Sequence, residues 1–133
     1  MTSCIRPRIL VVDNDPLVVT ALGTRLAHQG YFPVPAGTGA QALDVLRFGG
    51  IELVITDLHM PVLDGLGLIE RIRRNPITAD LPVVVVTGAE TAVCRQLETT
   101  PQLCLVRKPF SFGDLSSICH ELLGPTRPAR RAA

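Results

Sequence analysis

The stretch Ile51-Glu-Leu-Val-Ile-Thr-Asp57 is an apolar run that ends on an acidic residue. Its Val and Ile content, without clean alternation of polar residues, is typical of a strand buried on both faces of a parallel sheet. Four more apolar runs lie elsewhere in the chain, at Ile9 to Val12, Tyr31 to Val34, Pro82 to Val86 and Cys104 to Val106. The run at 31–34 is weaker, because Pro33 and Pro35 confine it to the edge of a sheet.

Segments with helical spacing separate these runs. One covers Pro16 to Gln29, and the next opens on a capping box of Thr38 and Gln41. Val18, Ala21, Leu22 and Leu26 form the apolar stripe of the first helix, and Leu66, Ile69 and Ile72 form that of the third. A fourth helix is expected within Thr91 to Leu97. Ser111 could cap the last helix, whose apolar residues are Leu115, Ile118 and Leu122. This alternation of strands and helices predicts an α/β fold, a doubly wound sandwich with right-handed crossovers.

The composition fits one globular domain. The chain has 133 residues, 47% of them hydrophobic and 19% charged, which predicts a single domain over 1–124 and a flexible arginine-containing tail over 125–133. A formal net charge of +1 gives no basic field for nucleic acid or an anionic membrane. The four cysteines form no C-x-x-C pair, so we expect reduced thiols. Without a signal peptide or spanning segment, a cytoplasmic protein is predicted.

Polar residues follow four of the five runs: Asp13-Asn-Asp15, Asp57, Thr87 and Lys108. The carboxyl ends of parallel strands meet at one edge, where open α/β sheets bind their ligands. Each residue alone is an ordinary turn, cap or surface residue. Together they indicate a phosphoryl site, because clustered carboxylates call for a cation such as Mg²⁺ and a carboxylate can act as a nucleophile.

Four motifs in this order resemble the receiver domains of bacterial response regulators: Val11-Val-Asp-Asn-Asp-Pro16, Thr56-Asp-Leu-His-Met-Pro61 with Asp64-Gly65, Val86-Thr-Gly88 and Arg107-Lys-Pro-Phe110. The resemblance extends from about Arg8 to Leu123. It implies a flavodoxin-like fold, with a five-stranded parallel sheet of order 2-1-3-4-5. It also implies a signalling phosphoacceptor of a two-component system, not an enzyme.

The resemblance further implies a role for each site residue. Asp57 would accept a phosphoryl group from a sensor histidine kinase or a histidine phosphotransfer protein, and the modified domain would switch its interaction with a downstream protein target. A homodimer is a further option. The other implied roles are Mg²⁺ binding by Asp13, Asn14, Asp57 and the backbone carbonyl of His59; phosphoryl contacts by Thr87 and Lys108; and a structural role for Pro61, Gly65 and Pro109, the last after a cis peptide bond.

Two departures from the family pattern bear on these roles. Asn14 stands where the family normally has a second acidic residue, so weaker Mg²⁺ binding is expected, since an amide oxygen brings no charge. Asp15 could compensate through a water, but a cap for the first helix is the preferred interpretation. Leu105 stands where many members have Tyr or Phe, which excludes an aromatic switch there.

Two other functions remain open. One is a receiver-like module that binds a protein partner without phosphorylation, which Asn14 favours. The other is a small phosphatase of the haloacid dehalogenase type, which also uses a nucleophilic aspartate. Against the phosphatase, Asp57 and the Lys108-Pro109 pair would have no role, and the chain is short for a cap domain.

Overall fold

The computed structural model describes residues 6–58, 65–88 and 102–123. Its elements in chain order are β1 (Arg8–Val12), α1 (Pro16–His28), β2 (Phe32–Ala36), α2 (Gly39–Arg47), β3 (Ile51–Asp57), α3 (Gly65–Arg74), β4 (Val83–Thr87), β5 (Leu103–Arg107) and α5 (Phe112–Leu123). The five strands are parallel and have the order β2-β1-β3-β4-β5. This confirms the predicted fold and strand order. The helix expected within Thr91 to Leu97 lies outside the described residues.

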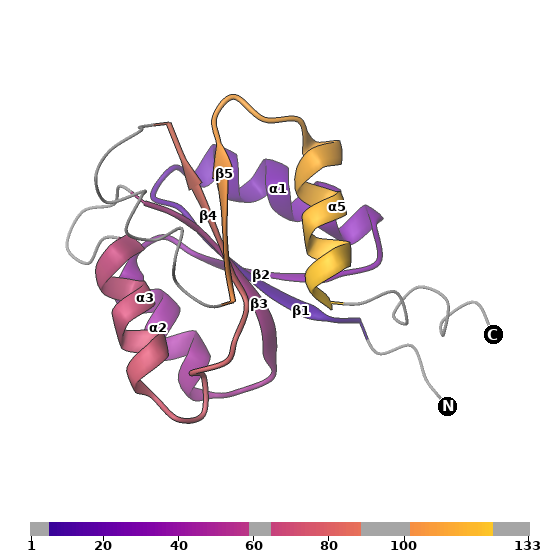
Figure 1. Cartoon of the computed structure of the whole chain (residues 1–133). Coiled ribbons are helices and arrows are strands. Elements are labelled where there is room, and N and C mark those ends of the chain that lie inside the picture. Colours follow the sequence, from indigo (N-terminus) through magenta and orange to yellow (C-terminus); the bar gives the residue numbers. More distant parts are fainter. Residues whose placement is uncertain (1–5, 59–64, 89–101, 124–133) are drawn as a thin grey trace, which may run out of the picture.

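Helices cover both faces of the sheet, α1 and α5 on one and α2 and α3 on the other (Figure 1). Successive residues of a strand point to opposite faces. In β1, Leu10 and Val12 pack on the α2/α3 side, whereas Ile9 and Val11 pack on the α1/α5 side. All four are at most 1% exposed. Burial on both faces explains why the strand sequences are continuously apolar.

The prolines of β2 lie on its open edge. Phe32 donates its N–H to the carbonyl of Pro7 (2.8 Å), and the carbonyl of Ala36 accepts from Asp13 (3.1 Å), so the even-numbered residues of β2 face β1. Pro33 and Pro35 therefore face outward, where they need no partner for a missing N–H. The prediction of an edge strand is confirmed, although β2 extends to Ala36.

Side chains cap three helices as the sequence indicates. Oδ1 of Asp15 accepts the N–H of Leu17 (2.9 Å) at the start of α1. Oγ1 of Thr38 accepts the N–H of Gln41 (3.0 Å) before α2. At α5, the hydroxyl of Ser111 accepts the N–H of Asp114 (3.0 Å). No helix in the described ranges is long and apolar enough to cross a membrane.

The buried faces of two helices are rotated relative to the predicted stripes. In α1, Val19 packs against the core beside Leu26, and Ala21 is exposed. In α3, Leu68 is completely buried, whereas Leu66 is only half-buried. Spacing predicts that one helix face is apolar. The position of the helix on the sheet decides which residues at the border of that face are covered.

Candidate phosphoacceptor site

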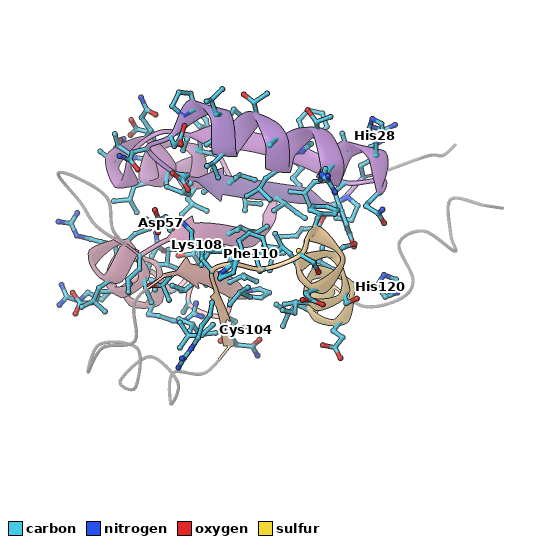
Figure 2. The ribbon with its side chains drawn as sticks, turned by 90° about the horizontal axis from the view of Figure 1, so that it is seen from above. His28, Asp57, Cys104, Lys108, Phe110 and His120 are labelled. Atoms are coloured by element: carbon cyan, nitrogen blue, oxygen red, sulfur yellow. The ribbon has the colours of Figure 1, made fainter. Side chains whose placement is uncertain are left out.

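The fold brings together four of the predicted site residues at the carboxyl ends of the strands. Asp13 follows β1, Asp57 ends β3, Thr87 ends β4 and Lys108 follows β5. The N–H of Lys108 donates to the carbonyl of Thr87 (2.8 Å). Figure 2 shows Asp57 and Lys108 at the same edge of the sheet. The polar residues that follow separate strands in the sequence thus form one site.

Asp13 is the most buried acid of the site. It is 7% exposed, and its Oδ1 accepts the N–H of Asp15 (2.9 Å). Burial raises the pKa of Asp13, the Asp15 hydrogen bond lowers it, and the nearby charge of Asp57 raises it again. Lys108 acts in the opposite direction, but the net pKa shift remains upward. Two carboxylates therefore repel each other here, and a cation would relieve that repulsion.

Asp57 forms the ion pair of the site. Its Oδ2 lies 3.9 Å from Nζ of Lys108, and the exposed fractions of the two side chains are 12% and 41%. Asp57 pairs with Val86 of β4, and the next N–H, of Leu58, donates to the carbonyl of Val86 (3.2 Å). These contacts with β4 fix the backbone at this point, so the carboxylate is held at the end of the strand.

Lys108 and Thr87 differ in their access to solvent. Lys108 is the only lysine in the chain, and the peptide bond that joins it to Pro109 is cis, as the resemblance implies. Thr87 is 1% exposed. The site thus combines a partly exposed ammonium group with a buried residue that carries a hydroxyl.

The remaining predicted residues have mixed outcomes. Asn14 is exposed next to Asp13, and Asp15 caps α1, which supports the preferred role of Asp15. Gly65 begins α3. His59 and Pro61 lie outside the described residues, so their predicted roles stay predictions.

Two features of the site were not identified from the sequence. The hydroxyl of Thr56, a fully buried residue, donates to the main-chain carbonyl of Asp57 (2.9 Å). A hollow of about 500 Å³ also opens beside Asp13 and Asn14, and Gln41 is part of its wall. Only the position of Thr56 directly before Asp57 could have indicated its hydrogen bond. No local sequence pattern indicates that α2 contributes Gln41 to the hollow.

The donors present suit a hard divalent cation. Asp13 and Asp57 supply carboxylate oxygens, and Asn14 supplies an amide oxygen, which are ligand types that Mg²⁺ prefers. Within the described part of the chain, no group of three or more His, Cys, Asp or Glu side chains is placed to hold a metal. Two carboxylates with neutral oxygens nearby therefore fit Mg²⁺ with several retained waters better than a fully protein-bound ion.

Curated relatives match most of this chain. It is 39% identical over 123 residues to the transcriptional regulatory protein GlrR of Escherichia coli, covering 91% of this chain and 27% of that protein. It is 40% identical over 109 residues to the sensor histidine kinase RcsC of Salmonella typhi, covering 80% of this chain and 11% of that protein. The chain thus spans about a quarter of the length of GlrR and about a tenth of the length of RcsC.

A solved structure and a family model agree with the fold. The response regulator protein TrrA of Thermotoga maritima, solved in complex with Mg²⁺-BeF, superposes with a TM-score of 0.78 at 30% identity, covering 88% of this chain and 99% of that one. The family model described as response regulator receiver domain matches residues 9–120. The chain therefore belongs to the response regulator receiver domain family of two-component signalling.

Proposed function

We propose that Asp57 accepts a phosphoryl group from a phosphohistidine of a sensor histidine kinase or a histidine phosphotransfer protein. A carboxylate oxygen of Asp57 forms the new bond to phosphorus, the phosphorus–nitrogen bond to the donor histidine breaks, and that nitrogen leaves with the bond's electron pair. The product is an acyl phosphate. The observation that carries this proposal is the 3.9 Å ion pair between Asp57 and Lys108 beside buried Asp13.

Each neighbouring residue has a proposed part in the transfer. Lys108 neutralises charge on the phosphoryl oxygens, because its ammonium group already lies over Asp57. The hydroxyl of Thr87 donates to one of those oxygens after transfer. Pro61, Gly65 and Pro109 shape the loops around the site.

The proposed ligands of Mg²⁺ are Asp13, Asn14, Asp57 and the backbone carbonyl of His59. Bound there, Mg²⁺ would neutralise charge on the phosphoryl group. The upward pKa shift of Asp13, to which the charge of Asp57 contributes, supports a cation between the two carboxylates. The neutral amide of Asn14 supports weak binding.

The proposed output is a switch in protein interactions. Phosphorylation adds charge and strong acceptors, which Lys108 and Thr87 can gather, and this shifts a two-state equilibrium of the domain. The downstream target is proposed to be a protein, with no direct contact to nucleic acid or membrane. We also propose that residues 1–124 form the domain and 125–133 a tail. A cytoplasmic location and a homodimer stay predictions.

Incubation with acetyl phosphate and Mg²⁺ tests the acceptor. The intact mass should increase by one phosphoryl group in the parent and stay constant in Asp57→Asn. Asp44→Asn, a change of an exposed acid on α2, is the matched control and should be labelled like the parent. Equal labelling of Asp57→Asn would refute the assignment.

A second function rests on Asn14. If the amide weakens Mg²⁺ binding enough to prevent phosphorylation, the domain would bind its partner without modification. No labelling of the parent by acetyl phosphate or by a panel of phosphorylated kinases would favour this function. The phosphatase hypothesis loses its support, because the receiver-domain family model matches residues 9–120.

A further inference from the structure

A groove runs between α2 and α3, outside the proposed phosphoacceptor site. It has a volume of about 420 Å³, and Leu43, Leu46 and Ile72 form apolar parts of its lining. Leu46 and Ile72 belong to the core on this side of the sheet, and Leu43 packs against it. The two helices lie next to each other on one face of the sheet (Figure 1). The groove is therefore an opening above the core whose lining is partly apolar.

Two large hydrophobic side chains next to the groove are exposed to solvent. Phe48 is 90% exposed and Ile77 is 86% exposed, the highest values among the large hydrophobic residues of the described part. Phe48 directly follows Arg47, and Ile77 directly precedes Thr78. Both Arg47 and Thr78 line the groove. Exposed apolar side chains next to a partly apolar hollow are typical of a surface that binds another protein.

The charged lining of the groove is more basic than acidic. Arg47 and Arg71 line it together with one acid, Asp44, and Asp44 is already 3.2 Å from Arg47. Arg74, in the last turn of α3 with Arg71, is also exposed. Arg73 is different, because its guanidinium donates to two main-chain carbonyls (2.7 and 3.1 Å). Asp44 alone therefore cannot neutralise Arg47 and Arg71, and an acidic ligand would complement these two arginines.

We propose that the α2–α3 groove is a docking surface for a short amphipathic helix of a partner protein, with acidic side chains beside Arg47 and Arg71. The groove is lined mainly by two helices, whose main-chain groups bond within each helix. An extended segment would find few partners there for its own N–H and C=O groups. A helix satisfies its main chain internally and can insert apolar side chains spaced i, i+3, i+4 and i+7.

Phe48 and Ile77 mark the end of this surface that lies farthest from Asp57. Phe48 precedes β3 and Ile77 precedes β4, so both lie near the amino ends of the strands. Asp57 is at the carboxyl end of β3, a strand of seven residues, which places Phe48 and Ile77 roughly 20 Å from it. A helix in the groove would leave Asp57 accessible. We therefore expect docking without phosphorylation, and the inference does not rest on the function proposed above.

A labelled peptide can test the docking surface. The probe is a helical peptide of about 15 residues with leucines at i, i+3, i+4 and i+7 and glutamates on either side. A control peptide has lysines in place of the glutamates. Fluorescence anisotropy should give a micromolar dissociation constant for the acidic peptide and at least about tenfold weaker binding for the basic one. Beryllofluoride with Mg²⁺ should change neither value by more than about twofold.

Matched charge reversals locate the binding. Arg71→Glu should weaken binding of the acidic peptide by at least about tenfold, whereas Arg6→Glu, at an exposed residue outside the groove, should leave it unchanged. Amide NMR shifts caused by the peptide should center on Leu43, Arg47 and Thr78. Circular dichroism checks that each variant is folded.

Several results would overturn the proposal. These are equal binding of the two peptides, no effect of Arg71→Glu, or NMR shifts centred away from the groove. Sedimentation that reveals a dimer lost in Arg71→Glu would assign the groove to a second copy of this chain instead. Co-sedimentation with phosphatidylcholine–phosphatidylglycerol vesicles that is lost in Phe48→Ser, without peptide binding, would assign the surface to a membrane.

Discussion

The charge of Lys108 should stabilise the metal-free protein by offsetting the carboxylates at the site. Its Nζ lies 3.9 Å from Oδ2 of Asp57, where two unit charges attract by about 1 kcal/mol in water and about 4 kcal/mol at an effective dielectric constant of 20. The Lys108 side chain is 41% exposed, so the lower figure applies. Lys108→Met keeps most of the stem and removes the charge. We expect it to lower the free energy of unfolding by about 1 kcal/mol and the Tm by about 3–5 °C.

The effect should depend on pH in one direction. Lys108 lowers the pKa of Asp13, so its removal raises that pKa further above the value in the unfolded chain. A carboxyl with a raised folded-state pKa contributes stability below its unfolded pKa and loses it as the pH rises through its folded pKa. The deficit of Lys108→Met should therefore be small below about pH 4, where carboxyls are protonated, and grow toward neutral pH.

Urea unfolding in EDTA at acidic and neutral pH measures this difference. Lys108→Arg retains the charge and should recover most of the stability, which separates charge from packing. With acetyl phosphate and Mg²⁺, Lys108→Met should be phosphorylated more slowly, because a preorganised cation is lost. Since Lys108 is the only lysine, ¹⁵N-lysine labelling gives one backbone signal that reports the switch in the parent. Parent-like stability and phosphorylation of Lys108→Met would show that Lys108 is an ordinary surface residue.

Three further changes test other parts of the molecule. Asn14→Asp should tighten Mg²⁺ binding by about tenfold, or about 1.4 kcal/mol, in calorimetric titration; equal affinity would place Asn14 away from the metal. Pro33→Val combined with Pro35→Val restores two N–H donors on the open edge of β2, so we expect concentration-dependent self-association in sedimentation; unchanged sedimentation contradicts the edge-blocking role. Burial raises the pKa of the Cys119 thiol to about 12, so iodoacetamide at pH 8 should label it at least about tenfold more slowly in the folded than in the urea-unfolded protein. Similar rates in mass spectrometry of its peptide would show that the thiol is accessible.

The sequence was most informative where one local interaction decides the structure. Asp15, Thr38 and Ser111 each bind an N–H two or three residues ahead, so chain-local chemistry suffices to place helix starts. The central strands are equally clear, because burial on both faces requires continuous apolar runs. The acidic residues at their ends then meet because parallel strands share a direction.

Features that depend on how elements pack were not predictable in this way. The exposure of Ala21 depends on how α1 is rotated over the sheet, and the hydrogen bond from Thr56 depends on the exact end of β3. The α2–α3 groove combines residues from Ala40 to Thr78, and no sequence pattern indicates that two helices leave an opening there. Such features require coordinates because they depend on distances between segments remote in sequence.

In the proposed function, the charges of the site would give Asn14 a role in the switch. Asp13 and Asp57 bring two negative charges and Lys108 one positive charge, so the unmodified site with Mg²⁺ carries about +1. Phosphorylation replaces the Asp57 carboxylate with a group of about −2, and the site with Mg²⁺ then becomes about neutral. An acid in place of Asn14 would make the unmodified site neutral instead. Because a partly buried site favours low net charge, the amide would favour retention of Mg²⁺ after phosphorylation over its retention before. In the proposed function, metal occupancy would then be coupled to the modified state.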